Sequence, residues 1–169
     1  ISMDNIIIKN LEVYCNHGVY REENVLGQKF LVSAKLSLNT RKAGIADALD
    51  VSVDYASVCK FINDYMKSHT FKLLEAVAEH LTLAMFAHFE MLHGITLEIK
   101  KPWAPIGLPI DYVSVEINRE WHTAYVALGS NLGDKLSYLE NAVASIKNDV
   151  NCKLLKISDF IITAPYGPV

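Results

Sequence analysis

The stretch Phe71-Lys72-Leu73-Leu74-Glu75-Ala76-Val77-Ala78-Glu79-His80-Leu81 decides the fold of this chain. Apolar residues recur from here at steps of three and four, at Leu74, Val77, Ala78, Leu81 and Met85. This spacing keeps one face of a helix apolar, and further apolar residues widen that face beyond a single stripe. We therefore expect a helix that runs to about Phe89 and packs on a sheet and on a second partner. His93-Gly94 is expected to close it, as glycine commonly does at helix ends.

The polar positions of this helix supply the first functional candidate. Lys72, Glu75, Glu79 and Thr82 share a narrow polar stripe. Glu75 lies near the expected helix start, where the helix dipole favours a charged carboxylate. From there it could accept two N–H donors from a flat heterocycle. Pattern alone favours a solvated surface carboxylate, so both interpretations stay open at this point.

Outward from this helix, four segments have the strand-like alternation of apolar and polar residues. They are residues 5–15, 28–39, 95–100 and 112–119. A first helix, capped by Asp54, precedes the helix described above. The order strand, strand, helix, helix, strand, strand predicts an α+β fold, with a four-stranded antiparallel sheet covered on one face by two helices. Residues 19–27, 40–52 and 102–109 are expected to be loops.

After Glu120 the chain begins a second, smaller unit. A short apolar strand is predicted at 123–128, followed by a glycine-bounded turn, a helix and a further strand at 153–163. A unit of about 50 residues rarely forms a stable core without help. We therefore expect the start of a truncated domain.

Composition excludes several classes of protein. Of the 169 residues, 51% are hydrophobic and 21% charged, which is typical of a globular chain. The net charge of -3 provides no basic field for nucleic acid, and no apolar run is long enough to span a membrane. Three cysteines, a small and odd number, fit reduced thiols in the cytoplasm.

Several separated motifs give residues 3–120 a family resemblance. They are Asn16-His17-Gly18, Glu22-Glu23-Asn24, Gly27-Gln28-Lys29-Phe30, Asp54-Tyr55, Leu73-Leu74-Glu75 and Ile99-Lys100-Lys101-Pro102. In this order and spacing they resemble dihydroneopterin aldolase of folate biosynthesis. The resemblance implies a tunnelling fold, in which subunits join their sheets edge to edge around a pore. It also implies a homo-oligomer, commonly an octamer, with active sites shared between subunits.

The resemblance also implies a lyase reaction that needs no metal, Schiff base or other cofactor. 7,8-Dihydroneopterin would be cleaved by a retro-aldol reaction into 6-hydroxymethyl-7,8-dihydropterin and glycolaldehyde. A base removes the proton of the 2′-hydroxyl, the carbon–carbon bond breaks, and the electrons flow into the C6=N5 imine of the pterin. Such a site needs a ring anchor, a base or proton relay, and a donor to the carbon.

Three residues match the family's catalytic positions. Lys101 matches its catalytic lysine, which can act as a base if burial or a neighbouring cation lowers its pKa. Lys100 is the competitor, but alternation puts it on the opposite face of the strand. Tyr55 matches a proton relay contributed by the neighbouring subunit. Glu23 matches a loop acid near the reacting side chain, with Glu22 adjacent to it.

Four further residues match substrate-binding positions. Glu75 matches the anchor that accepts from the pterin's ring N3–H and 2-amino group, and Leu74 and Val53 match positions whose backbone contacts the pterin. His17 lies beside the active-site loop, although an ordinary turn histidine explains it equally well. No metal site is predicted, because the spacings of the histidines do not form a tight ligand cluster.

Residues 123–169 resemble the opening of 6-hydroxymethyl-7,8-dihydropterin pyrophosphokinase. The matching segments are Ala127–Asp134 and Thr163–Pro168, and within the second of these Thr163 and Tyr166 match pterin-contacting positions. That enzyme uses the aldolase's product, so the two resemblances together imply a bifunctional protein that ends in a partial α/β ferredoxin-like fragment. Mg and ATP would belong only to a complete kinase domain. The expected metal-binding acids and nucleotide-contacting arginines would lie beyond Val169, so we predict no pyrophosphoryl transfer from this chain.

Two other function classes stay open. An epimerase acting on the same or a phosphorylated pterin would share the anchor and the base. A ring scaffold that only carries the kinase domain would need neither residue. The presence of both Lys101 and Glu75 favours an enzyme over the scaffold.

Overall fold

The computed structural model describes residues 3–163, and the chain divides into two compact units, Ile1–His122 and Thr123–Val169. The part of the pyrophosphokinase-like motif at residues 164–168, predicted to contribute to pterin contact through Tyr166, lies outside the described residues.

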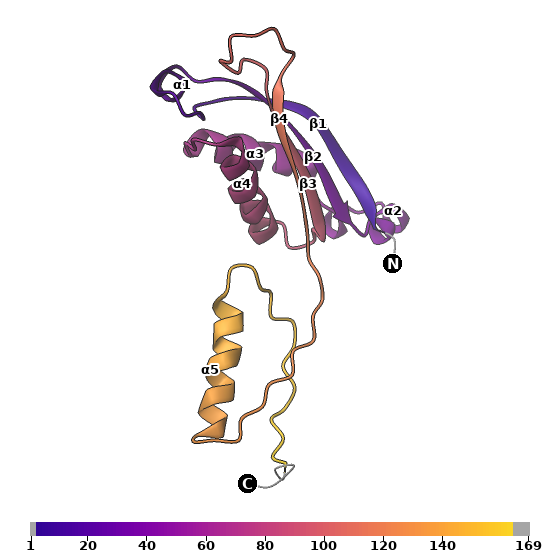
Figure 1. Cartoon of the computed structure of the whole chain (residues 1–169). Helices are drawn as coiled ribbons and strands as arrows, with labels where there is room; N and C mark the ends of the chain where they lie inside the picture. The colour runs from indigo at the N-terminus through magenta and orange to yellow at the C-terminus, as the bar shows by residue number, and fades with distance from the viewer. Residues whose placement is uncertain (1–2, 164–169) are drawn as a thin grey trace. The chain divides into compact units, whose positions relative to one another are not determined.

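The first unit is built on a four-stranded antiparallel sheet in the order β1-β2-β3-β4. Its strands are β1 (Asp4–Cys15), β2 (Gln28–Leu38), β3 (Gly94–Lys101) and β4 (Val113–Glu120). Two helices, α3 (Tyr55–Ser68) and α4 (Leu74–His88), cover one face of this sheet (Figure 1). The predicted order of elements and the predicted sheet are therefore confirmed, with strand ends that differ by one residue.

The core lies between this sheet face and the two helices. The central strand β2 alternates as predicted, and its inward residues are at most 1% exposed: Phe30, Val32, Ala34, Leu36 and Leu38. The helices meet them with residues three or four positions apart: Val58, Ile62 and Met66 from α3, and Val77, Ala78, Leu81 and Met85 from α4. Burial of each large aliphatic side chain stabilises the fold by about 1.5–3 kcal/mol.

One position of the central helix differs from the prediction. Thr82 was expected on the polar stripe of α4, but its side chain is fully buried. The reason is that α4 packs against β3, β4 and α3 together, and so buries more of its circumference than a single stripe. The neighbouring Glu79 stays on the polar side, where it pairs with Arg119 of β4 at 2.6 Å.

The helix ends show one confirmed and one wrong prediction. Asp54 caps α3, because its carboxylate accepts hydrogen bonds from the backbone N–H groups of Ala56 at 2.9 Å and Ser57 at 3.2 Å. Gly94, predicted to close α4, instead opens β3, and α4 ends at His88 with Phe89, not a glycine, as its C-cap. A Cβ at Gly94 would lie 3.3 Å from the Cβ atoms of its cross-strand neighbours, so this glycine serves close strand packing.

Three short helical segments occur where the sequence predicted loops. They are α1 (Arg21–Leu26), α2 (Arg41–Ala46) and the 3-10 helix η1 (Leu49–Val51). Segments of three to six residues are too short to show a periodic apolar pattern, which is why sequence periodicity misses them. The connection between β3 and β4 is a loop, as predicted.

The second unit contains one helix, α5 (Lys135–Asn148), whose cap Asp134 accepts a hydrogen bond from the N–H of Ser137 at 3.1 Å. The strands predicted at 123–128 and 153–163 are absent, because neither segment forms a hydrogen-bonded ladder within the described part of this unit. The ferredoxin-like fragment therefore stays a prediction. Across residues 3–163, none of the helices has the length and apolar character that a membrane crossing needs.

Candidate active site

A nearly buried ion pair lies where β3 ends. Lys101 is the last residue of β3, and its Nζ lies 2.5 Å from Oε1 of Glu23 in α1. The two side chains are only 12% and 9% exposed. Both residues were predicted to be catalytic, and the fold brings them together from distant parts of the sequence. Glu22, the alternative to Glu23, is exposed.

Glu23 is held in place by further hydrogen bonds. Its Oε2 accepts from the backbone N–H of Tyr20 at 3.1 Å, and its Oε1 accepts from Nε2 of Gln28 at 3.0 Å. Burial alone would raise the pKa of Glu23, but the hydrogen bonds from Lys101, Tyr20 and Gln28 and the charge of Lys101 hold it below its usual value. The carboxylate is therefore ionised at neutral pH.

Gln28 is a site residue that sequence reasoning did not identify. It is 6% exposed, and its Oε1 has no hydrogen-bond partner among the described residues. A polar residue at the start of a strand that is otherwise apolar on its inner face was the available signal. Burial of an unpaired amide oxygen is costly, so the hydrogen bond from Gln28 to Glu23 is made at the expense of this oxygen.

The turn after β1 packs directly on this pair. A Cβ at Gly18 would collide with the carboxylate of Glu23, so the position requires glycine. The neighbouring His17 is 1% exposed, and its Nδ1 accepts a hydrogen bond from the N–H of Phe71 at 3.2 Å. Burial and then the nearby charges of His69 and Lys101 lower the pKa of His17 to about 4, which leaves the ring neutral.

The same turn brings the start of α4 to this end of the sheet. The N–H of Gly18 donates to the carbonyl of Phe71 at 2.9 Å, so Phe71 is bound through both of its backbone groups. Leu74 and Glu75 follow as the first two residues of α4. Glu75 is exposed and makes no hydrogen bond or ion pair within residues 3–163. Its carboxylate at a helix N-terminus is therefore free to receive a ligand.

The other two predicted residues lie elsewhere in the chain's own fold. Val53 is 5% exposed and belongs to the core, and Tyr55 is 63% exposed at the start of α3. The helices α3 and α4 run antiparallel, and Phe61 stacks on His88 at the end of α4 with ring centroids 4.8 Å apart. A helix as long as α4 spans about 20 Å, so Tyr55 is far from Lys101 of the same chain.

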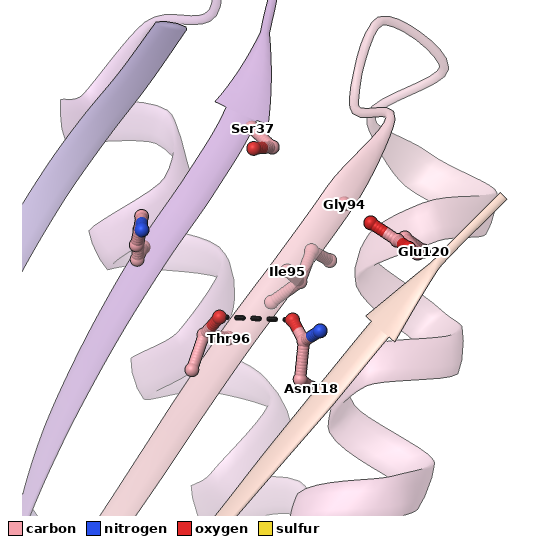
Figure 2. Close-up of a pocket in the computed structure, with 7 residues that line it drawn as sticks. Ser37, Gly94, Ile95, Thr96, Asn118 and Glu120 are labelled. Carbon is pink, nitrogen blue, oxygen red and sulfur yellow. Dashed lines mark hydrogen bonds between the residues drawn. The ribbon is translucent and has the colours of Figure 1, made fainter. Parts of the chain in front are cut away.

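The opposite face of the sheet is polar and carries a shallow hollow of about 190 Å³ (Figure 2). Its lining residues are Lys35, Ser37, Gly94, Ile95, Thr96, Asn118 and Glu120. Within it, Oγ1 of Thr96 donates to Oδ1 of Asn118 at 2.9 Å. Because alternate residues of β3 point to opposite faces, this hollow is separate from the Lys101 site.

Lys100 belongs to that opposite face, as the alternation predicted. Its Nζ lies 3.3 Å from Oδ1 of Asn10, 3.6 Å from Oε2 of Glu98 and 4.8 Å from the ring centre of Tyr112. Residues 3–163 hold no group of three or more His, Cys, Asp or Glu side chains suited to a metal ion.

Comparison with known proteins identifies relatives of the first unit. The family model described as dihydroneopterin aldolase matches residues 6–118. The chain is 36% identical to the dihydroneopterin aldolase of Methylorubrum extorquens over 116 residues, which cover 69% of this chain and 89% of that protein. It is 33% identical to the Bacillus subtilis enzyme over 118 residues, which cover 70% and 98%.

A solved structure gives the same result. The E. coli dihydroneopterin aldolase in complex with neopterin superposes with a TM-score of 0.64 and 27% identity. The match covers 69% of this chain and 99% of the E. coli chain.

Proposed function

This chain belongs to the dihydroneopterin aldolase family, and we propose that its Lys101–Glu23 pair performs the proton transfers of the family's reaction. That reaction is the retro-aldol cleavage of 7,8-dihydroneopterin into 6-hydroxymethyl-7,8-dihydropterin and glycolaldehyde, a step of folate biosynthesis. The observation that carries the assignment of residues is the nearly buried ion pair at the end of β3.

The pair is suited to move one proton at a time. In the resting pair Lys101 is the ammonium donor and Glu23 the acceptor, 2.5 Å apart. Transfer of a proton to Glu23 would leave a neutral Lys101 amine, which can accept the proton of the substrate's 2′-hydroxyl. The C1′–C2′ bond then breaks to release glycolaldehyde, and its electrons enter the C6=N5 imine. C1′ next takes up the proton that Lys101 received, which gives the 6-hydroxymethyl product, and the proton on Glu23 returns to Lys101. Because the pterin is its own electron sink, we propose that no metal or other cofactor is required.

The substrate's ring would be held at the start of α4. Glu75 has an exposed carboxylate that makes no hydrogen bond or ion pair within the described residues. It lies close to the loop at Phe71, whose hydrogen bond to His17 connects it to the turn that packs on the ion pair. Two parallel N–H donors of a pterin, at N3 and the 2-amino group, fit one carboxylate. Backbone groups of Leu74, and of Val53 from a neighbouring subunit, are proposed to complete the binding of the ring, with His17 as support beneath it.

A second copy of the chain is proposed to complete the site. Tyr55 lies at the opposite end of the helix layer from Lys101, about one helix length away, so a relay through Tyr55 needs a neighbouring subunit. The sheet offers two edges for assembly, β1 and β4, which have no strand partner on their outer side within residues 3–163. We propose a ring-forming homo-oligomer, an octamer by the family resemblance, with each site built from two subunits.

The alternatives differ in what they release. An epimerase would invert the side-chain centre of the pterin and release no glycolaldehyde, and a scaffold would leave the substrate unchanged. The deciding experiment incubates the protein with 7,8-dihydroneopterin and follows glycolaldehyde and 6-hydroxymethyl-7,8-dihydropterin, with Lys101→Ala as the control. We expect both products from the parent protein and neither from Lys101→Ala. No product from a folded, ring-forming parent would refute the aldolase assignment.

For the second unit we propose the N-terminal part of a pyrophosphokinase, with no transfer activity in this chain. The support is the glycine-bounded turn followed by the helix α5 with its Asp134 cap. AMP release from ATP that depends on added pterin would contradict this proposal. The three cysteines are free thiols, which supports a cytoplasmic location as a further proposal.

A further inference from the structure

The short helix α1 carries Glu23 but has no apolar anchor. Glu23 is its only buried residue, and Val25 and Leu26 are 68% and 71% exposed. A six-residue helix with an exposed apolar side is not held in place by hydrophobic burial. Some other interaction must fix its distance from Lys101.

Side-chain donors from β1 and the turn after it bind the backbone of α1 and of Gly27, which follows α1. The hydroxyl of Tyr14 in β1 donates to the carbonyls of Leu26 at 3.0 Å and Gly27 at 3.1 Å. Nδ2 of Asn16 donates to the carbonyl of Asn24 at 3.0 Å. These bonds satisfy carbonyl groups at the end of α1 that have no partner within the helix.

Two further contacts show that this arrangement is tightly fitted. Nδ2 of Asn24 donates to the carbonyl of Gly18 at 2.9 Å, which joins α1 to the glycine packed on Glu23. Gly27 has a φ of 69°, and a Cβ there would lie 2.9 Å from Cε1 of Tyr14. The ring of Tyr14 therefore lies directly against the end of the helix.

We propose that Tyr14 and Asn16 are positioning residues, which hold α1 so that Glu23 stays in contact with Lys101 during the retro-aldol step. Tyr14 suits this role because it belongs to β1, where it pairs with Lys29 of β2 in the sheet register. Its hydroxyl thus fixes the position of α1 relative to the sheet, although α1 has no apolar core contacts of its own. This inference rests on the proposed roles of Lys101 and Glu23.

Tyr14→Phe removes one hydroxyl from a side chain that is 55% exposed and should leave the fold intact. We expect kcat to fall about threefold to tenfold, the range that corresponds to one hydrogen bond. KM for 7,8-dihydroneopterin should stay unchanged, because the ring is held at Glu75. Asn16→Ala should have the same effect, and it serves as the second variant if Tyr14→Phe folds poorly.

The pH profile separates this role from a merely structural one. The pKa of Glu23 is low because of its hydrogen bonds to Lys101, Tyr20 and Gln28. If α1 moves away from Lys101 and these hydrogen bonds lengthen, the pKa of Glu23 rises. The acidic limb of the kcat profile then moves to higher pH. Tyr125→Phe is the matched control, since Tyr125 is 98% exposed and makes no hydrogen bond within the described residues.

A double-mutant cycle completes the test. If Tyr14 acts only through Glu23, then Tyr14→Phe combined with Glu23→Gln should be no slower than Glu23→Gln alone. Unchanged kcat and acidic limb in both Tyr14→Phe and Asn16→Ala would overturn the inference, as would losses that multiply in the double variant. Full activity of Lys101→Ala would instead overturn the proposed function, so the two failures are distinguishable.

Discussion

At the scale of single residues, Lys101 should matter for activity far more than its neighbour. We expect Lys101→Ala to lower kcat by about a hundredfold or more, the usual contribution of a positioned acid–base group. It should also lower the free energy of unfolding by about 1–3 kcal/mol, because Glu23 would keep a nearly buried carboxylate without its cation. Glycolaldehyde release and urea unfolding measure the two effects.

Lys100→Ala is the matched control for that experiment. Lys100 lies on the polar face of the same strand, 3.3 Å from Asn10, so its loss should leave kcat within about twofold of the parent, as is usual for residues outside the reacting site. Equal losses in the two variants would mean that the end of β3 is needed for folding only and would remove the catalytic role of Lys101.

His17 makes stability depend on pH. Its pKa is lowered from 6.5 to about 4 in the folded protein, first by burial. In the unfolded state His17 therefore binds a proton below about pH 6.5, whereas in the folded state it binds one only below about pH 4. Because the unfolded state binds more protons between these values, the free energy of unfolding falls as the pH falls through this window. Between pH 7 and pH 5 we expect a loss of about 2 kcal/mol.

The comparison of the parent protein with His17→Gln checks this effect. The variant has no imidazole to titrate, so its free energy of unfolding in urea should lose about 2 kcal/mol less than the parent does between pH 7 and pH 5. If the two proteins show the same pH dependence, the ring of His17 is not buried as a neutral group.

The sequence pattern distinguished some residues of this site correctly and left others undecided. Glu23 could not be distinguished from Glu22 by pattern, because a six-residue helix has no period to fix which side faces inward. Gln28 had only a weak signal, a polar residue at the start of a strand that is apolar on its inner face, since its importance comes from burial beside a carboxylate. Lys101 was distinguished from Lys100 correctly, because strand alternation is strict.

At the scale of elements, the helix α4 should contribute most of its stability through its buried side. Leu81 is fully buried between the sheet and α3. Leu81→Ala should therefore lower the free energy of unfolding by about 2–5 kcal/mol, through lost burial and the cavity that remains. Ala87→Ser, at an exposed position of the same helix, should change it by less than about 0.5 kcal/mol. Urea unfolding of both variants would refute the central role of α4 if their losses were similar.

Elements with a long repeating pattern were the predictable ones. The helix at Leu74–His88 and the strand at Gln28–Leu38 repeat their apolar residues often enough to fix both type and inward face. The short helices α1 and α2 are positioned by individual hydrogen bonds, such as those from Tyr14 and Asn16 to α1. Such bonds depend on residues that are distant in sequence or specific to one geometry, and no periodicity reveals them.

At the scale of the whole molecule, the candidate site is divided between the two ends of the helix layer. Lys101 and Glu23 lie at one end of this layer and Tyr55 lies at the other. About one helix length separates them within one chain. Sequence motifs identify such residues but contain no information about which copy of the chain supplies them. The folded chain supplies that information, because it shows which catalytic residues of one subunit are too far apart to act in the same site.

This division predicts complementation between inactive variants. Lys101→Ala and Tyr55→Phe should each be nearly inactive as pure oligomers. When the two are unfolded, mixed in equal amounts and refolded together, a site that combines Lys101 of one subunit with Tyr55 of its neighbour forms at about one position in four, by random assembly around a closed ring. Glycolaldehyde release should then recover to about a quarter of the parental rate.

The outcome decides how the site is built. Each variant refolded alone is the control. The double variant Lys101→Ala with Tyr55→Phe, refolded with an equal amount of parent, should give about a quarter of the parental rate if sites are shared and about half if each subunit carries its own site. If the mixture of single variants shows only the sum of their separate rates, Tyr55 acts within its own subunit or not at all. Recovery would show that a catalytic group reaches Lys101 from a second copy, so that ring assembly itself completes the active site.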